Sequence, residues 1–432
     1  MTADGLRAAD LLIDAGRIVE IAPELRGAHE EIDARGLVVL PGAIDAHVHF
    51  NEPGRTQWEG ARAGSRALAA GGGTMFFDMP LNSTPCTVNA AAFDSKRAAI
   101  EASSITDFAL WGGLVPGGVT EMAELAARGV VGFKAFMCDS GLSEFPRADD
   151  VTLLEGMREA ARLGLPVAVH AESEQLIRKP AGPAIRDFLA SRPVQAELDA
   201  IRRALVLAAE TGAKLHIVHV SSGRGVALAF EARARGVDVS IETCPHYLCF
   251  TEDDMERLGG VAKCAPPLRA AGDREALWAE LLGGHVDLVA SDHSPAEPAM
   301  KAMKNRDFVS VWGGIAGAQS LLAVLLDMGY HGRQLPLERI ADLVATGPAR
   351  RFGIAGKGSL SPGNDGDLVL VDLAASFTLD APDLHQRHKM SPYVGRSFRG
   401  TVRRTVRRGE TIVLDGAITA RTGGRLIRSV HV

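Results

Sequence analysis

The chain has 432 residues, of which 46% are hydrophobic and 23% charged, and its net charge at neutral pH is −6. This is the composition of a globular protein, and it excludes a disordered or fibrous chain. Without a basic excess, neither nucleic acid nor an anionic membrane is expected as the main partner. Apolar runs stay well below the ~18 residues of a membrane helix, and the first residues lack a signal-peptide pattern. We therefore expect a soluble, cytoplasmic protein.

Short apolar, β-branched segments alternate with helix-compatible segments, such as Trp58–Ala70 and Val194–Glu210, through the middle of the chain. Strands that alternate with helices predict a parallel sheet. Eight such units over roughly 300 residues predict an α/β protein with a (β/α)₈ TIM-type barrel, and a doubly wound sheet is the alternative. The eight expected strands are Ala43–Phe50, Thr74–Met79, Asp107–Gly112, Val130–Phe136, Pro166–His170, Lys214–Val220, Val237–Glu242 and Val286–Asp292.

The two ends of the chain have a different pattern, with short strands separated by turn residues. We expect these ends to meet in one small flanking β domain, formed by residues 1–42 and 351–432, beside a barrel of residues 43–350. The expected strands of this domain are Leu11–Ile21, Gly36–Val39, Leu368–Val371, Thr401–Val406 and Glu410–Val413.

The first expected barrel strand ends in a pattern typical of a metal site, Asp45-Ala-His47-Val-His49. Residues two apart on a strand point to the same side of the sheet, so His47 and His49 share one face with Asp45. Two imidazoles held in this way can chelate a divalent metal.

Four other expected strands carry a polar residue at or near their carboxyl end, and these residues are Lys134, His170, His219 and Asp292. In an α/β barrel all carboxyl ends open onto one face, where active sites lie. A single histidine at such a position is more often a hydrogen-bonded structural residue. Six candidates at matching ends of five strands instead favour a metal centre.

Lys134 is the unusual member of this set, because a protonated lysine beside two cations would be repelled and costly to bury. Reaction of its amine with CO₂ would give a carbamate, which is an anionic ligand able to bridge two metals. The alternative is a salt bridge across the barrel mouth.

Two other histidines lie within or just after the expected strands. His216 lies three residues before His219 and is expected to face the other way, whereas His246 follows the seventh strand and is within reach of the site.

Several segments resemble the cyclic amidohydrolases, the family of dihydroorotases, hydantoinases or dihydropyrimidinases, and allantoinases. The resemblance runs from about Leu11 to the tail. It is carried by PGAIDAHVHFNEPG, GFKAF, HAE, HVSS, ETCPHYL, KCAPPLR, SDHSP and KGSLSPGNDGDLVLVD.

This resemblance implies a barrel with a flanking β domain and two divalent metals. Zinc is the expected metal, and Co, Mn and Fe suit the same ligands. The first metal would be bound by His47, His49 and Asp292, and the second by His170 and His219, with carboxylated Lys134 as the bridge. Asp292 would also be catalytic, as the base that takes a proton from the attacking hydroxide and delivers it to the ring nitrogen. By analogy with the family, we expect a homotetramer.

The choice among family members depends on the residues expected around the substrate. A carboxylate substrate such as dihydroorotate favours an arginine after the HxHF segment, and Asn51 stands there instead. Its amide and carbonyl would match the N–H and C=O groups of a neutral ring. Asn82, Ser294 and backbone groups around Cys264 are further candidates for substrate binding, with loop capping as the alternative for the two asparagines. Arg55 is expected to orient a substrate or to pair with Glu52 or Glu59.

Hydantoinases typically place a tyrosine shortly after the bridging lysine, and no tyrosine follows Lys134 closely. HFNEPGRTQWEG, FFDMPLNSTP, GFKAFM and SDHSP together resemble the allantoinases most. The expected reaction is therefore the opening of the hydantoin ring of allantoin to give allantoate, a step of purine degradation. Dihydroorotase is the first alternative and hydantoinase the second. A non-catalytic scaffold relative is the third, although such relatives lose metal ligands and all six candidates are present here.

Overall fold

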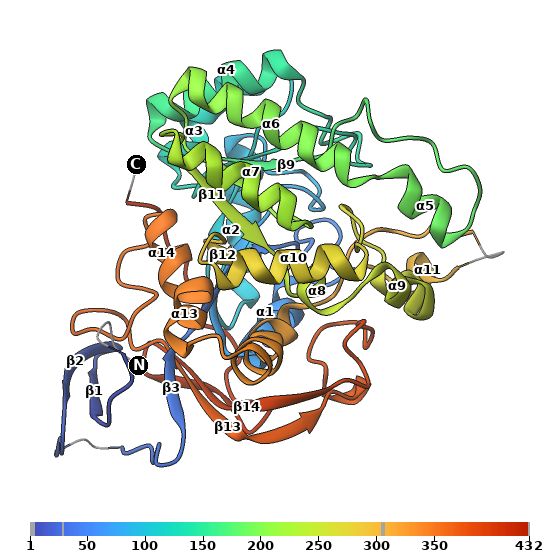
Figure 1. The fold of residues 1–432 in the computed structure, drawn as a ribbon. Coiled ribbons are helices and arrows are strands. Elements are labelled where there is room, and N and C mark those ends of the chain that lie inside the picture. Colours follow the sequence, from blue (N-terminus) through green and yellow to red (C-terminus); the bar gives the residue numbers. More distant parts are fainter. Residues whose placement is uncertain (1–4, 28–29, 304–306, 431–432) are drawn as a thin grey trace.

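The computed structural model describes residues 5–27, 30–303 and 307–430. In these residues eight parallel strand positions form a ring. Helices lie around it (Figure 1). A backbone bridge between Val48 and His293 closes the ring. The strands are β4 (Ala43–Val48), β5 (Gly73–Asp78), β6 (Asp107–Leu110) with its continuation β7 (Gly112–Gly113), β8 (Phe133–Phe136), β9 (Val167–His170), β10 (Leu215–Ile217), β11 (Val239–Thr243) and β12 (Leu288–Val289).

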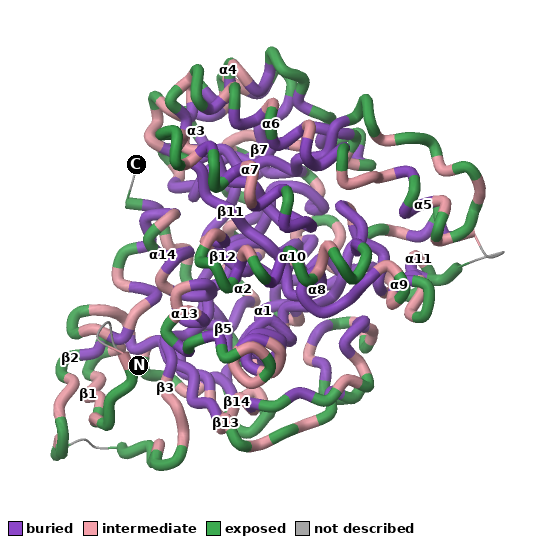
Figure 2. Tube along the Cα trace, viewed as in Figure 1, coloured by how far each residue is buried: buried purple, intermediate pink, exposed green. Residues whose placement is uncertain are grey.

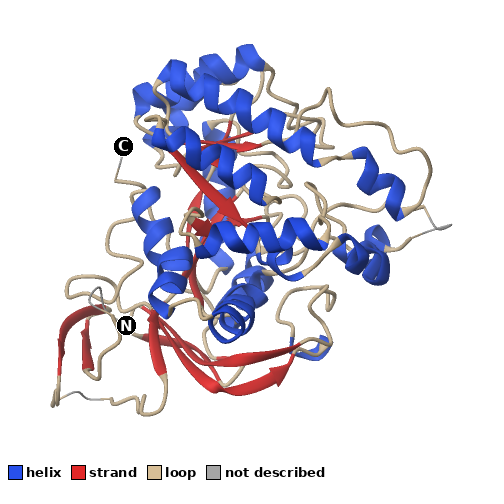
Figure 3. Ribbon diagram, viewed as in Figure 1, coloured by secondary structure: helices blue, strands red, loops and turns tan. Residues whose placement is uncertain are grey.

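Helices cover the outside of this barrel (Figure 3). Their starts follow local capping rules, since the side chains of Asn89 and Asp149 accept hydrogen bonds from the first turns of α2 and α4. The covering helices are α1 (Ala61–Ala70), α2 (Ala90–Ser103), α3 (Met122–Ala127), α4 (Asp150–Leu163), α6 (Val194–Thr211), α7 (Gly223–Ala234), α10 (Ala271–Leu282), α12 (Leu321–Val324), α13 (Leu337–Ala341) and α14 (Gly347–Arg351). Short helices interrupt the connecting loops, namely α5 (Ile185–Ser191), α8 (Pro245–Cys249), α9 (Glu252–Leu258) and α11 (Pro298–Lys301).

The barrel strands are buried except at Phe136, the half-buried last residue of β8, as expected for a parallel sheet covered by helices (Figure 2). Side chains fill the interior of the barrel, including Phe77 and Trp111. The indole N–H of Trp111 donates to the carbonyl of Ala46 at 3.1 Å, so this buried polar group is satisfied. Within the described ranges, we find no helix with the length and apolar character needed to span a membrane.

Both chain ends contribute to one antiparallel sheet with the order β16-β15-β14-β13-β3. The strand β3 from the N-terminal part pairs with β13 from the C-terminal part, with Leu368 opposite Pro41. The bounds are β3 (Val38–Pro41), β13 (Leu368–Thr378), β14 (Ser397–Arg407), β15 (Glu410–Leu414) and β16 (Ala417–Ile418). The first strands, β1 (Asp10–Asp14) and β2 (Arg17–Ala22), form a hairpin outside this sheet. The predicted barrel and flanking β domain are therefore confirmed.

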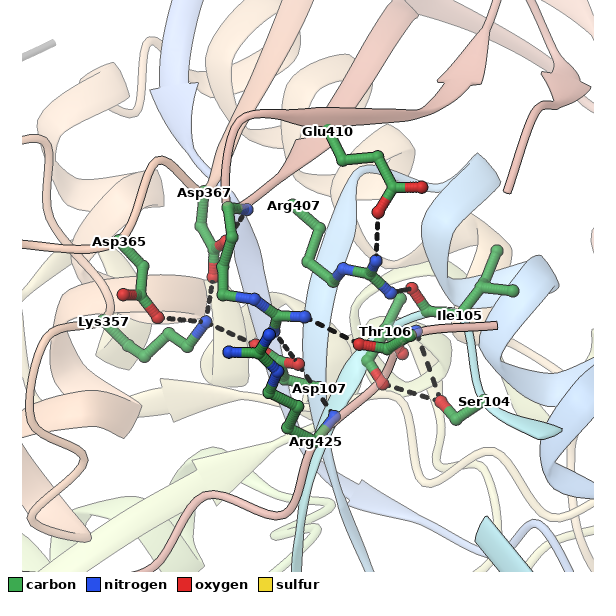
Figure 4. Close-up of polar contacts among 12 residues, drawn as sticks. Ser104, Ile105, Thr106, Asp107, Lys357, Asp365, Asp367, Arg407, Glu410 and Arg425 are labelled. Carbon is green, nitrogen blue, oxygen red and sulfur yellow. Dashed lines mark hydrogen bonds and ion pairs between the residues drawn. The ribbon is translucent and has the colours of Figure 1, made fainter. Parts of the chain in front are cut away.

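A buried ionic cluster joins the C-terminal part of the chain to the amino end of the barrel (Figure 4). The ammonium of Lys357 lies 2.6 Å from carboxylate oxygens of both Asp107 and Asp367, and 2.8 Å from Asp365. Arg408 also donates to Asp107, the first residue of β6. The KGSLSPGNDGDLVLVD segment thus supplies charges that hold the C-terminal part against the barrel, at the end opposite to the predicted metal ligands.

Candidate metal centre

The six predicted ligands lie at or just beyond the carboxyl ends of five barrel strands. His47 and Lys134 are within β4 and β8, His170 is the last residue of β9, and His219 follows β10. The remaining two, His49 and Asp292, lie directly after β4 and shortly after β12. Each of these side chains is buried or nearly so, and the most exposed, that of Asp292, is 13% exposed. The barrel therefore brings all six to one end.

Short distances between ring and carboxylate atoms show that these predicted ligands lie close to one another. Asp292 Oδ1 lies 3.3 Å from Nε2 of His47 and 3.4 Å from Nε2 of His49. Ligand atoms of His47, His219 and Asp292 all lie within 4.8 Å of one another. The His219 ring in turn lies 4.6 Å from that of His170, measured between ring centroids. Lys134 Nζ lies 5.1 Å from the centre of the Phe136 ring, on which the His170 ring stacks.

The chemistry of these groups fits divalent cations. Lys134 Nζ, His49 Nδ1 and His219 Nδ1 are buried and have no hydrogen-bond partner within the protein, an arrangement that is costly unless a ligand is bound. Burial lowers the pKa of His47, His170 and His219, so these rings are neutral, as metal ligands must be. Burial also lowers the pKa of Lys134 to about 8, although Asp292 and Glu242 oppose this shift. A neutral amine is the form that reacts with CO₂.

Unusual backbone conformations are concentrated at the site. Nine described non-glycine residues have a positive φ, and four of them are predicted site residues: Asn51, Asn82, His219 and Asp292. Such conformations are disfavoured for residues with a side chain and cluster at functional sites.

The expectation that His216 faces away from the site is wrong. Strand parity predicts that it faces away from the site of His219, but β10 ends at Ile217 and His219 has a φ of 40°. His216 Nε2 lies 3.1 Å from Glu242, a carboxylate that also contacts the site.

Two buried glutamates were not singled out from the sequence. Glu242 Oε1 lies 2.8 Å from His47 Nδ1, and Glu172 Oε2 lies 2.8 Å from His170 Nε2. Burial alone would raise the pKa of Glu242, but His47 and His216 hold it at about 2, so it remains a carboxylate. The signal in the sequence was weak: Glu172 lies two residues after His170, and Glu242 ends the seventh expected strand.

The predicted substrate-binding residues Asn51, Asn82 and Ser294 meet beside the centre. Asn51 Nδ2 donates to the carbonyl of Pro295 at 3.2 Å, and Asn82 Nδ2 donates to Ser294 Oγ at 3.5 Å. Asn51 Oδ1 is buried without a partner. One of the two amide hydrogens of Asn51 is therefore bonded within the protein, while its carbonyl oxygen keeps its full accepting capacity.

Cys264 and Arg55 complete the predicted set. Cys264 is buried, and burial raises the pKa of its thiol to about 12, so the sulfur is protonated. The expected pairing of Arg55 with Glu52 or Glu59 is wrong. Its guanidinium instead donates to the carbonyl of Asn82 at 3.3 Å and lies 3.7 Å from Glu144. Both expected partners have other contacts: Glu52 accepts from the N-terminus of α1, and Glu59 from Arg387.

His246 is a further buried histidine near the centre. It lies in the first turn of α8, is 1% exposed, and has no hydrogen-bond partner at either ring nitrogen. Burial lowers its pKa to about 4, while the charge of Asp292 acts in the opposite direction. His246 is therefore a neutral imidazole, with one donor and one acceptor that the protein leaves unpaired.

Comparison with known proteins places this geometry in a family. A model of the amidohydrolase family matches residues 38–412. The chain belongs to the amidohydrolase family. A protein named allantoinase from Solibacter usitatus is 63% identical over 99% of this chain and 94% of that protein. One from Rubrobacter xylanophilus is 58% identical over 98% and 95%.

Solved structures show the same fold. The L-hydantoinase (dihydropyrimidinase) from Arthrobacter aurescens superposes with a TM-score of 0.96 at 34% identity, over 99% of this chain and 97% of that one. The dihydropyrimidinase from Brevibacillus agri NCHU1002 gives a TM-score of 0.92 at 29% identity, over 99% and 96%. The prediction of a cyclic amidohydrolase is confirmed at the level of family and fold.

Proposed function

We propose that this protein is an allantoinase, which adds water to allantoin and opens its hydantoin ring to give allantoate. The observation that carries this proposal is the similarity over nearly the full chain, 41–63% identity, to proteins named allantoinase. The convergence of all six predicted ligands supports it, because a non-catalytic relative would have no need to retain them.

His47, His49 and Asp292 would hold one divalent cation, and His170 and His219 a second, with Lys134 between them as a carbamate. We expect zinc, and Co, Mn or Fe would suit the same ligands. When bound, two such cations supply a hydroxide nucleophile at neutral pH and polarise the carbonyl under attack. The unpartnered Lys134 Nζ and His219 Nδ1 support this assignment.

The carboxylate of Asp292 is suited to move the proton. Burial would raise its pKa, but His47 and His49 keep it well below the usual value, so it is ionised at neutral pH, which is the form that a general base requires. In the proposed reaction, the nucleophile is hydroxide, which is water that has already released one proton to solvent. It adds to a ring carbonyl carbon while Asp292 takes the remaining proton. Asp292 then delivers this proton to the ring nitrogen as the C–N bond breaks, which leaves a carboxylate on the product.

A neutral substrate fits the polar groups around the centre. Asn51 Oδ1 and the ring nitrogens of His246 are buried and unpaired. We propose that they bind N–H and C=O groups of allantoin, together with Asn82, Ser294 and backbone groups at Cys264. Dihydroorotate would need a cationic partner for its carboxylate, and Arg55 is engaged with Asn82 and Glu144. Hydantoinase is the second candidate, because the structural neighbours carry that name at lower identity.

We also propose domain boundaries at residues 42/43 and 350/351, since β3 joins the β domain, β4 opens the barrel and α14 ends at Arg351.

A cytoplasmic homotetramer is proposed as well. Exposed apolar side chains on three helices support an interface: Val206 on α6, Phe230 on α7 and Leu282 on α10. Sedimentation equilibrium tests the tetramer.

Reconstitution tests the proposed function. The protein is stripped with a chelator, reloaded with zinc and bicarbonate, and assayed for allantoate with its metal content measured in parallel. We expect the stripped protein to be inactive and activity to return as about two cations bind per chain. Full activity without metal, or two bound metals without any ring opening, would contradict the proposal.

A further inference from the structure

The carboxylate of Glu242 connects the two sets of proposed ligands. This side chain projects from β11 and is fully buried. Its Oε1 atom lies 2.8 Å from Nδ1 of His47 and also accepts a hydrogen bond of 3.2 Å from the backbone N–H of His219. The other oxygen, Oε2, lies 3.1 Å from Nε2 of His216. One oxygen atom therefore contacts a residue of each proposed metal position.

At His47, this contact decides which ring nitrogen faces the centre. A carboxylate can only accept a hydrogen bond, so Nδ1 must carry the proton. The lone pair is then on Nε2, the nitrogen that lies 3.3 Å from Asp292 in the centre. A carboxylate that fixes the tautomer in this way also makes the imidazole a better ligand.

At His219, the same oxygen supports a strained backbone. The residue has a φ of 40°, which a histidine rarely adopts, and the bond from its N–H to Glu242 helps to hold it there. In this conformation the ring lies 5.4 Å from that of His47 and 4.6 Å from that of His170, measured between centroids.

We propose that Glu242 is a positioning residue that makes the two cations bind cooperatively. This inference rests on the proposed function for the ligand assignment and deepens it. A cation at the first position fixes His47, which holds Glu242 and thereby orders His219 for the second cation. By linkage, a cation at the second position favours the first to the same extent.

Glu172 provides a matched control on the same barrel face. Like Glu242, it is a fully buried carboxylate 2.8 Å from a ring nitrogen of a proposed ligand, here His170. Its other partner, Arg192, is not a ligand. Loss of the Glu172 carboxylate should therefore weaken the second position alone.

The test is a titration of the metal-free full-length chain with zinc against a chromophoric chelator, in the wild type, Glu242→Gln and Glu172→Gln. In the wild type we expect the two cations to enter together. Glu242→Gln should lower the affinity at both positions by roughly 10–100-fold and abolish the cooperativity. Glu172→Gln should lower the intrinsic affinity of the second position alone and leave the cooperativity intact. The ring-nitrogen shifts of labelled histidine should show the Nδ1–H tautomer of His47 in the wild type and its loss in Glu242→Leu, which, unlike glutamine, offers no acceptor at this position.

Two kinds of result would overturn the proposal. One is a Glu242→Gln variant that binds both cations with wild-type affinity or that loses the second cation alone. The other is stepwise filling of the wild type through a well-populated one-zinc form, which decides the matter even where a variant fails to fold. Because the titration uses zinc and no substrate, cooperative binding without turnover of allantoin would contradict the proposed function and leave this inference standing.

Discussion

His47 Nε2 lies 3.3 Å from Oδ1 of Asp292, although His47 belongs to the first barrel strand and Asp292 follows the last. The backbone explains this proximity: the N–H of His49 donates to the carbonyl of His293 at 2.8 Å, which closes the barrel beside the centre. The proposed metal site therefore forms only when the ring of strands is complete. Metal binding should accordingly stabilise the closed barrel.

Replacement of the proposed bridging lysine tests the centre itself. We expect Lys134→Ala to lose bound metal and to reduce allantoin turnover by roughly 10³-fold or more, because several kcal/mol of metal-dependent stabilisation would be lost. Short carboxylic acids should restore part of the activity by supplying a bridging anion. The control is Lys214→Ala, which removes a lysine whose ammonium donates to the carbonyl of Gly164, away from the centre. An active Lys134→Ala protein with two metals would exclude the carbamate.

Asn51 can be tested without disturbing its backbone. Glycine accepts the positive φ of 63° at this position, so Asn51→Gly removes the side chain and leaves the loop unstrained. We expect kcat/KM for allantoin to fall roughly 5–100-fold, as for the loss of one or two hydrogen bonds of about 1–1.5 kcal/mol each, with unchanged metal content. Gln334→Gly is the control, since this exposed residue has a similar φ of 58°. Equal kcat/KM in Asn51→Gly and the wild type would remove Asn51 from the substrate site.

The two unpaired nitrogens of His246 make a separate prediction. If they bind the substrate, His246→Ala should lower kcat/KM for allantoin about 10–100-fold while both metals stay bound. His285→Ala serves as the control, because His285 is paired with Glu280 and lies before β12, at the opposite end of the barrel. Kinetics that match the wild type would remove His246 from the proposed substrate site.

The ionic cluster around Lys357 should affect stability and not catalysis. Lys357→Met would leave Asp107, Asp365 and Asp367 facing one another, at a cost of about 3–5 kcal/mol for a broken buried pair. Thermal unfolding of the metal-loaded protein should show a clearly lower midpoint, with normal kcat in the fraction that remains folded. Arg162→Met, which breaks an exposed ion pair with Glu159, should change the midpoint little.

This destabilisation should depend on pH in a defined way. Burial would lower the pKa of Lys357, but Asp367 and Asp107 raise it above its usual value. Its contribution is therefore complete below the usual lysine pKa of about 10.4 and is lost as the pH rises through the higher folded value. Asp107 has a lowered pKa, since Lys357 and Arg408 outweigh its burial, so its contribution is lost in acid. Burial already raises the pKa of Asp367, and loss of Lys357 should raise the pKa of the carboxylates left behind, so the variant becomes easier to fold as they take up protons. The difference in midpoint between wild type and Lys357→Met should therefore be largest near about pH 9 and should shrink as the pH falls.

The barrel strands and the six ligand candidates could be predicted from the sequence because both rest on local patterns. Each strand is a short apolar segment, and each candidate sits at its carboxyl end, as at His170 in β9. Arg55 and Glu242 depend on partners distant in the sequence, so their contacts could not be predicted. Strand alternation does not predict the orientation of His216 relative to His219, because β10 ends at Ile217 and His219 has a positive φ instead of an extended conformation. The separate β1–β2 hairpin was missed because turn residues do not specify which strands pair.

The most direct test of the account compares kcat/KM for allantoin with that for dihydroorotate, using the zinc-loaded, full-length protein. An arginine in place of Asn51 would bind a carboxylate through charge-assisted hydrogen bonds of roughly 1.5–3 kcal/mol each, and asparagine cannot supply them. We predict ready conversion of allantoin to allantoate and a kcat/KM for dihydroorotate at least about tenfold lower. Efficient hydrolysis of dihydroorotate with allantoin left intact would contradict the assignment.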